Sequence, residues 1–210
     1  MKKSYIVLII CACSLIIILN VIGIKKMLEE YEYTSEIQRV LADDFEIEKK
    51  WLVDVENIPC DLSNAEIMKI EQTYISFSPE IRVRKINDGN EYSFAVKTGI
   101  TEDGMTRNEM EENITEEEYR KMIEKKEGNT VYKTRYQFLD GKYLYAIDIF
   151  EGELAGLAYL EIEFENQEEA EKFQEPDWVI KDVTADLNYK NGYLARYGIP
   201  ASFYSYKIER

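Results

Sequence analysis

The chain opens with one long apolar stretch and then changes to short segments in which apolar and polar residues alternate. Residues 5–24 are predominantly apolar, with Ser14, Asn20 and Gly23 as the clear interruptions. A helix of this length can cross the hydrocarbon layer of a bilayer. We therefore expect residues 1–24 to form a transmembrane anchor and the protein to be a single-pass membrane protein. A cleaved signal peptide is the alternative, and lysines on both flanks leave open which side the rest of the chain faces.

Residues 25–44 are charged and contain neither proline nor glycine, which predicts a juxtamembrane helix or linker. From Phe45 onward, apolar residues recur at every second position, as in β-strands whose two faces differ. This alternation predicts eight strands at about 45–53, 70–77, 80–87, 91–99, 106–113, 131–138, 142–151 and 156–165. Turn-forming residues at 87–90 and 140–141 predict hairpins between neighbouring strands.

A few helices are expected among the strands. A capping box that begins at Thr115 predicts a helix that continues to about Lys126. Asn166 is a good N-cap for another helix, which would end before Pro176. A short helix over residues 63–69 is expected to join the first two strands. The fold class is therefore mainly β, with flanking helices.

Charged residues occupy one face of many of these strands. Glu46, Glu48 and Lys50 project together from the first strand, because alternate residues of a strand share a face. The same alternation recurs in later strands at these positions: Arg82 and Arg84; Lys97; Arg107, Glu109 and Glu111; Lys133 and Arg135; Glu161 and Glu163. One such strand is typical of the solvent-facing side of an antiparallel sheet. The repetition of this pattern in several strands, often as two residues with the same charge, favours a closed barrel whose charged faces converge on a polar lumen.

The glutamates of this lumen favour a bound cation. Two carboxylates about 5 Å apart repel by roughly 3 kcal/mol at an effective dielectric constant near 20, so Glu46 with Glu48 and Glu161 with Glu163 are expected to share a divalent metal. The sequence contains no histidine, which excludes histidine-dependent hydrolase triads and the common zinc sites. Oxygen ligands favour Mg²⁺ or Mn²⁺.

The bases of the lumen favour a polyanion. They are too numerous to be neutralised by each other, and guanidinium groups fit phosphate oxygens in bidentate geometry. The proposed phosphate ligands are Lys50, Arg82, Arg84, Lys97, Arg107, Lys133 and Arg135. The formal net charge of −15 argues against nucleic acid as a partner. A metal beside a polyphosphate in an enclosed site is suited to phosphoryl transfer.

The charged segments, taken in the order in which they occur along the chain, resemble those of the CYTH domain, or triphosphate tunnel metalloenzyme, superfamily. Glu46-Ile47-Glu48-Lys49-Lys50 is similar to its E-x-E-x-K signature. The matching segments that follow are residues 72–75 (QTYI), 81–84 (IRVR), the strand that ends at Lys97, 107–111 (RNEME), 133–136 (KTRY), 148–150 (DIF), 160–163 (LEIE) and 176–189. The resemblance covers residues 45–200, which we take as one domain, and leaves 201–210 as a tail.

This resemblance implies an eight-stranded antiparallel closed barrel around a tunnel, and metal-dependent hydrolysis of triphosphates. The small bacterial members that act on inorganic tripolyphosphate are the most similar. Tyr74 matches a tyrosine that serves there as a candidate proton acceptor, although a phenol is a poor base at neutral pH and orienting the water is an equally suitable role. The resemblance also implies supporting tunnel acids at Glu109, Glu111, Asp148 and Asp182. Two residues depart from the family pattern: Thr73 replaces a glycine and is expected to crowd the tunnel, and Asp182 replaces a glutamate.

The sequence therefore predicts a membrane-anchored, metal-dependent tripolyphosphatase with a small-molecule polyphosphate substrate. Two alternatives remain open. One is a membrane-anchored module that binds polyphosphate or nucleotide without turnover, and the other is a triphosphatase acting on ATP or thiamine triphosphate. A pure binding module could lose Glu161 or Glu163, and the chain keeps both.

Overall fold

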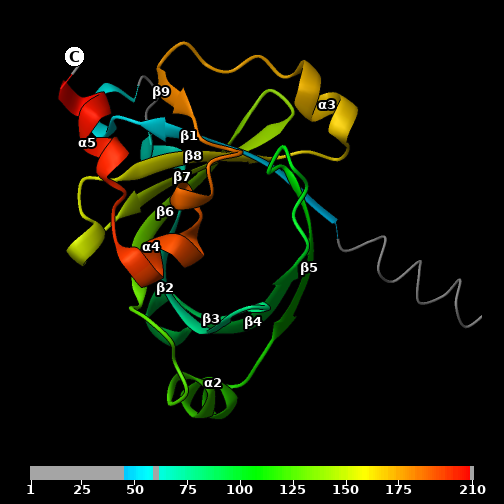
Figure 1. Ribbon diagram of the computed structural model, residues 1–210, viewed down its shortest axis with the longest axis vertical. Helices are drawn as coiled ribbons and strands as arrows, with labels where there is room; N and C mark the ends of the chain where they lie inside the picture. Colours follow the sequence, from blue (N-terminus) through cyan, green and yellow to red (C-terminus); the bar gives the residue numbers. More distant parts are fainter. Residues whose placement is uncertain (1–44, 59–61, 209–210) are drawn as a thin grey trace, which may run out of the picture. The chain divides into compact units, whose positions relative to one another are not determined.

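The computed structural model describes residues 45–58 and 62–208. Eight strands form an antiparallel barrel that the pairing of β1 with β5 closes (Figure 1). The strands are β1 (Phe45–Val53), β2 (Glu66–Phe77), β3 (Glu80–Ile86), β4 (Glu91–Thr98), β5 (Thr106–Asn113), β6 (Val131–Asp140), β7 (Tyr143–Phe150) and β8 (Ala158–Glu163). Their order around the barrel is β1-β5-β4-β3-β2-β6-β7-β8. The predicted eight-stranded closed barrel is confirmed.

A ninth strand, which the sequence pattern did not predict, pairs with β1 beyond the start of β5. Residues 45–47 of β1 pair with β5, and residues 51–53 pair with β9 (Val179–Asp182). The opposite edge of β1 pairs with β8 along residues 48–52. Residues 51–52 of β1 pair on both edges, and the backbone groups of Glu48 and Lys50 on the other edge bond to Met105 and Val183, so the backbone of this strand is hydrogen-bonded on both sides where its charged residues lie.

The two N-cap predictions are confirmed. The Thr115 side chain accepts from the backbone N–H of Glu118, and the Glu118 side chain reaches back to complete the capping box of α2 (Glu116–Ile123). Asn166 caps α3 (Gln167–Lys172). The helix expected at residues 63–69 is wrong. Two short 3-10 turns, η1 (Val55–Asn57) and η2 (Leu62–Asn64), lie between β1 and β2, and residues 66–72 pair with β6 instead of forming a helix.

Apolar side chains form clusters on both sides of the barrel wall. On the outer side, Trp51, Leu160 and Ile162 are completely buried in a cluster that α3 covers through Ala170, together with Phe173 just beyond the helix. A second cluster fills one end of the interior, where Leu52 lies two residues beyond Lys50 on the same face of β1. The lumen is thus polar along only part of its length, which the strand alternation alone did not predict.

The chain after β9 closes this apolar end. It forms the 3-10 turn η5 (Leu187–Tyr189) and the helices α4 (Asn191–Tyr197) and α5 (Ala201–Ile208). Leu194 of α4 and Phe203 of α5 pack into the interior cluster. Residues 201–208, which the sequence analysis assigned to a tail, therefore form a helix that packs against the domain.

Within the part of the chain that the structure describes, no helix has the length and apolar character needed to cross a membrane. The predicted anchor at 1–24 and the predicted linker at 25–44 lie outside the described residues.

Candidate active site in the barrel lumen

The charged strand faces meet in a cavity of about 60 Å³ inside the barrel. The residues that line it are Glu46, Glu48, Arg82, Arg84, Lys97, Arg107, Glu109, Glu111, Arg135, Glu161, Glu163 and Asn191. All of them except Asn191 are sites that the sequence predicted. The cavity has room for only a few water molecules. A larger anion must therefore displace some of the ion pairs that now cross the lumen.

A buried ion cluster forms the floor of this cavity. The Lys50 Nζ lies 2.8 Å from Oε1 of Glu161 and 3.4 Å from Oε1 of Glu48. Glu161 also accepts from Arg135, whose guanidinium makes two further bonds of 2.7 and 2.8 Å to Asp148. Burial alone would raise the pKa of Glu161, but Lys50 and the other nearby bases hold this pKa well below its ordinary value. Glu161 is therefore ionised and holds the bases of β1 and β6 together.

Lys133 lies beneath this cluster and donates to Asp148. It is 1% exposed, and burial lowers its pKa to about 8 in spite of the Asp148 carboxylate. The predicted sites Lys50, Lys133 and Asp148 thus do not line the cavity directly. They support the residues that do.

The opposite wall carries a second network, formed by β3, β4 and β5. Glu46 accepts from Lys97 at 2.6 Å and from Arg107 at 2.9 Å, and Arg82 donates to Glu109 at 2.7 Å. The buried Nε of Arg82 has no hydrogen-bond partner among the described residues. A buried donor without an acceptor is costly, so this guanidinium is suited to an anionic ligand.

Arg84 lies further along the same wall. Its Nε donates to Gln72 at 3.0 Å and its Nη1 lies 3.3 Å from Glu111. Glu111 also accepts from Ser93 at 2.7 Å. Gln72 belongs to a segment that matches the family, but neither Gln72 nor Ser93 was predicted as a site residue, although Gln72 shares a strand face with Tyr74 and could have been found by alternation.

The acids that face each other across β1 and β8 suit a divalent cation by their chemistry. Glu48 and Glu163 are opposite one another in the strand register, and Glu46 follows on the same face. Desolvation, together with the negative charges of Glu46 and Glu48, raises the pKa of Glu163 to about 7 even though Glu163 lies at the exposed end of β8. Oε1 of Glu48 is buried and has no hydrogen-bond partner among the described residues.

The described side chains include no group of three acids converged as the ligands of a bound metal would be. Glu46 and Glu161 are hydrogen-bonded to bases, whereas Glu48 has one longer ion pair, 3.4 Å, with Lys50. The donor set fits a hard cation, because carboxylate oxygens with unmet negative charge are what Mg²⁺ and Mn²⁺ prefer. Glu48 and Glu163 are the two acids best placed to hold such a cation.

Tyr74 lies at the junction between the polar cavity and the apolar end. It is completely buried, stacks on Phe77 with ring centroids 5.4 Å apart, and its hydroxyl accepts from Gln72 at 2.6 Å. Burial and the charge of Glu80 raise the pKa of Tyr74 above its ordinary value. A neutral phenol cannot accept a proton readily, so the structure favours an orienting role over a proton-accepting one.

Two residues lie elsewhere than the sequence analysis expected. Thr73 does not crowd the tunnel: it alternates with Tyr74, and its hydroxyl lies 2.9 Å from that of Thr130. Asp182 is exposed, is not among the residues that line the polar cavity, and accepts from the backbone N–H of Thr184 at 2.8 Å. Thr184 in turn accepts from the backbone N–H of Lys50. Asp182 therefore supports the backbone behind the site instead of contacting the lumen.

Two residues at the start of α4 were missed by the sequence analysis. Asn191 lines the polar cavity with a buried Oδ1 that has no partner among the described residues. Lys190 lies beside it and donates to the carbonyl of Gly104 at 3.1 Å. No local pattern identifies them, because they enter the site only through the packing of α4 against the barrel.

Comparison with known proteins gives a consistent result. No protein-family model matches the chain. It is 35% identical over 157 residues to an inorganic triphosphatase of Nitrosomonas europaea, a match that covers 71% of this chain and 96% of that protein. It is 33% identical over 154 residues to an inorganic triphosphatase of Acetivibrio thermocellus, a match that covers 72% of this chain and 93% of that protein.

Solved structures agree in fold. The crystal structure of an inorganic triphosphatase matches with a TM-score of 0.52 and 31% identity, covering 71% of this chain and 93% of that one. A Hippeastrum protein, described as a putative adenylyl cyclase with a dominant triphosphatase activity, matches with a TM-score of 0.50 at 13% identity. This match covers 60% of this chain and 82% of that one. The latter likeness concerns the fold alone.

Proposed function

Because the chain belongs to the CYTH, or triphosphate tunnel, superfamily, we propose that it hydrolyses inorganic tripolyphosphate to pyrophosphate and phosphate. The observation that carries this proposal is the meeting of bases from β3, β4, β5 and β6 with the glutamates of β1 and β8 in one lumen. Membership of the superfamily implies a divalent metal, and we propose Mg²⁺ or Mn²⁺ because the available donors are carboxylates.

The bases would hold the substrate in an extended form along the lumen. Arg82, with its unpartnered Nε, and Arg84 present guanidinium forks to the phosphate oxygens. Lys97 and Arg107 would exchange their contacts with Glu46 for contacts with phosphate. Lys50, Lys133 and Arg135 form the buried layer that keeps the floor of the site positively charged.

Hydrolysis adds one water molecule across a phosphoanhydride bond. The water oxygen forms a bond to the terminal phosphorus, the bridging oxygen leaves with pyrophosphate, and the released proton passes to solvent or a product oxygen. A metal held by Glu48 and Glu163 would supply charge neutralisation at the phosphate oxygens. The protein's own contribution is to align the chain, to offset the charge that builds up in the transition state, and to orient the water near Tyr74.

Phosphate release from tripolyphosphate, measured with each metal, tests the proposal. Glu161→Gln and Arg84→Ala should each lower kcat/KM by roughly 100-fold, as expected when a group that stabilises the transition state is lost. Glu112→Gln and Lys85→Ala are matched controls, because these residues alternate with Glu111 and Arg84 and lie on the other strand face. Full activity in both lumen variants would contradict the assignment. Binding of tripolyphosphate without turnover by the unaltered protein would favour a binding module.

We also propose that residues 5–24 anchor the protein in a membrane as a single pass. Their apolar length supports this proposal. The full chain should sediment with membranes and resist extraction at high salt, whereas a chain that begins at residue 25 should not. Protease accessibility of the catalytic domain in sealed vesicles would then decide which side it faces.

A further inference from the structure

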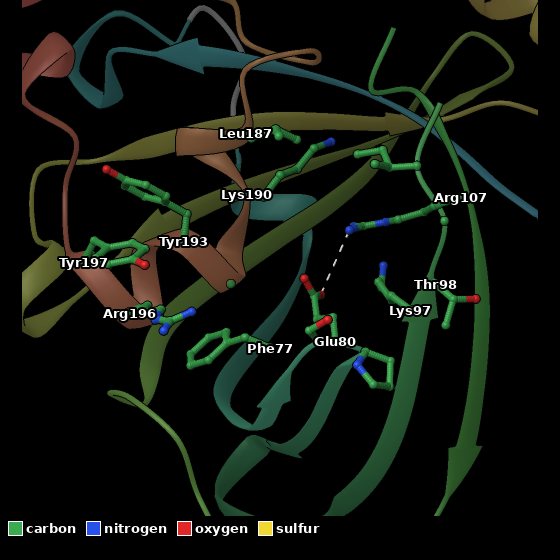
Figure 2. A pocket seen from close by; sticks show the side chains of 15 residues that line it. Phe77, Glu80, Lys97, Thr98, Arg107, Leu187, Lys190, Tyr193, Arg196 and Tyr197 are labelled. Atoms are coloured by element: carbon green, nitrogen blue, oxygen red, sulfur yellow. Dashed lines mark ion pairs between the residues drawn. The ribbon is translucent and has the colours of Figure 1, made fainter. Parts of the chain in front are cut away.

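A second pocket, of about 590 Å³, adjoins the polar cavity on the side of α4 (Figure 2). It lies between η5 and α4, the β2–β3 hairpin, and the adjoining ends of β4 and β5. Lys97 and Arg107 line both this pocket and the polar cavity. A ligand held in the lumen can therefore extend past these two bases into the second pocket.

Lys190 is a buried cation on this route. It is 7% exposed, and among the described residues its ammonium group has one hydrogen bond, to the Gly104 carbonyl. No carboxylate of the described residues lies within ion-pair distance of its ammonium group. Burial and the positive charge of Lys50 lower its pKa to about 8. A buried ammonium without an anionic partner is costly, which points to an anion that is absent from the protein itself.

The close approach of α4 to the barrel brings Lys190 into this position. A Cβ atom at Gly192 would lie 3.0 Å from the carboxylate of Glu80 and 3.5 Å from the ring of Tyr74. Glycine therefore lets the start of α4 pack tightly against β2 and β3. This packing holds Lys190 and Asn191 at the boundary between the two cavities.

Arg196 provides a second cation, across the pocket from Lys97 and Arg107 (Figure 2). Its guanidinium lies 5.2 Å from the ring centroid of Phe77 and 5.3 Å from that of Tyr197, and no carboxylate of the described residues pairs with it. Tyr193 packs on Tyr197 with centroids 4.7 Å apart. The aromatic rings thus position the guanidinium and have faces already covered, which favours an anionic ligand over a flat aromatic one.

We propose that this pocket is a second phosphate-binding subsite, which takes a phosphate group beyond the three held in the lumen. Arg196 binds its oxygens, Lys190 supplies positive charge at the boundary between the two cavities, and Lys97 and Arg107 hold the adjoining phosphate (Figure 2). This inference rests on the proposed function, because it places the triphosphate in the lumen. The phosphate group has two possible sources, the fourth phosphate of inorganic tetraphosphate or the orthophosphate released by the reaction.

Arg196→Ala in the full-length protein tests the subsite. If the fourth phosphate binds there, the KM for tetraphosphate rises about tenfold, the loss expected for one charge-assisted contact, while the KM for tripolyphosphate stays within about twofold. If orthophosphate binds there, the inhibition constant of orthophosphate against tripolyphosphate hydrolysis rises instead. Arg196→Lys should restore part of either effect. Arg120→Ala, an exposed arginine on α2, is the matched control and should change neither value.

The subsite is overturned if Arg196→Ala leaves the KM for tetraphosphate and the orthophosphate inhibition constant unchanged, or if it weakens tripolyphosphate and tetraphosphate equally. Hydrolysis of tripolyphosphate by the unaltered protein tests the proposed function separately. If tripolyphosphate is not hydrolysed, calorimetric titration of tetraphosphate into the unaltered protein and into Arg196→Ala still tests the subsite. Equal affinities would reject the subsite, and tenfold weaker binding by the variant would support it.

Discussion

Glu48 of β1 and Glu163 of β8 lie directly opposite one another in the strand register, in a lumen where Glu46, Glu109 and Glu161 are hydrogen-bonded to bases and Glu48 has one longer ion pair, 3.4 Å, with Lys50. Among the described residues, no lysine or arginine lies within ion-pair distance of Glu163. Two carboxylates in this arrangement repel each other, and the raised pKa of Glu163 reflects desolvation together with the negative charges of Glu46 and Glu48. A divalent cation would remove the repulsion.

The first prediction concerns this pair. Glu163→Gln should raise the metal concentration that gives half-maximal activity by about 10- to 100-fold, because a charged oxygen ligand is lost. The melting temperature without metal should stay the same or rise, since the substitution also removes a repulsion. Glu165→Gln, on an exposed residue just beyond β8, is the control. An unchanged metal requirement in Glu163→Gln would place the metal elsewhere.

The second prediction separates the two roles considered for Tyr74. If its hydroxyl orients the water, Tyr74→Phe removes one hydrogen bond and lowers kcat by about 3- to 10-fold. If it were the general base, the loss would be about 10²- to 10⁴-fold. Since burial and Glu80 raise its pKa, the hydroxyl stays protonated at neutral pH and we expect the smaller loss. The pH profile of kcat should keep its shape in the variant.

The third prediction concerns pH and Lys133. Its pKa of about 8 lies below the ordinary 10.5, so its ammonium group loses its proton as the pH rises through 8. The KM for tripolyphosphate should therefore rise above pH 8, by at most about tenfold for each pH unit. In Lys133→Arg the charge persists and the KM should stay flat to pH 9.5.

Lys190 has a similar pKa of about 8 and supplies the contrast for that experiment. A rise in KM that persists in Lys133→Arg and disappears in Lys190→Arg would assign the titration to Lys190. Such a result would also bring Lys190 into contact with tripolyphosphate itself.

Strand alternation predicted most of the lumen because a strand's geometry places alternate residues on one face wherever the strand lies. Glu46, Glu48 and Lys50 needed no tertiary information for this reason. The same rule did not predict where the lumen turns apolar. Leu52 continues the same face of β1, and only its packing with α4 and its neighbours shows that this end of the interior is filled.

Segments whose structure depends on distant partners were the ones missed or mistaken. Residues 66–69 looked helical locally and became strand through pairing with residues 134–137 of β6. The short strand β9 contains little alternation and depends on the free edge of β1. Lys190 and Asn191 belong to no periodic pattern, and they reach the site because Gly192 permits close packing of α4.

The last prediction tests whether α4 is an integral part of the domain. Leu194 is 2% exposed and packs in the interior cluster with Leu52 and Tyr74. Leu194→Ala should lower the free energy of unfolding by about 2 to 5 kcal/mol, because the transfer of a buried side chain is lost and a cavity is left. Leu139→Ala, at a residue that is 72% exposed on the β6–β7 hairpin, should change it by less than about 0.5 kcal/mol. Urea denaturation of both variants measures the difference. If Leu194→Ala were as stable as the control, α4 would be a loosely attached segment, and Lys190 could not be held at the boundary between the two cavities as the structure places it.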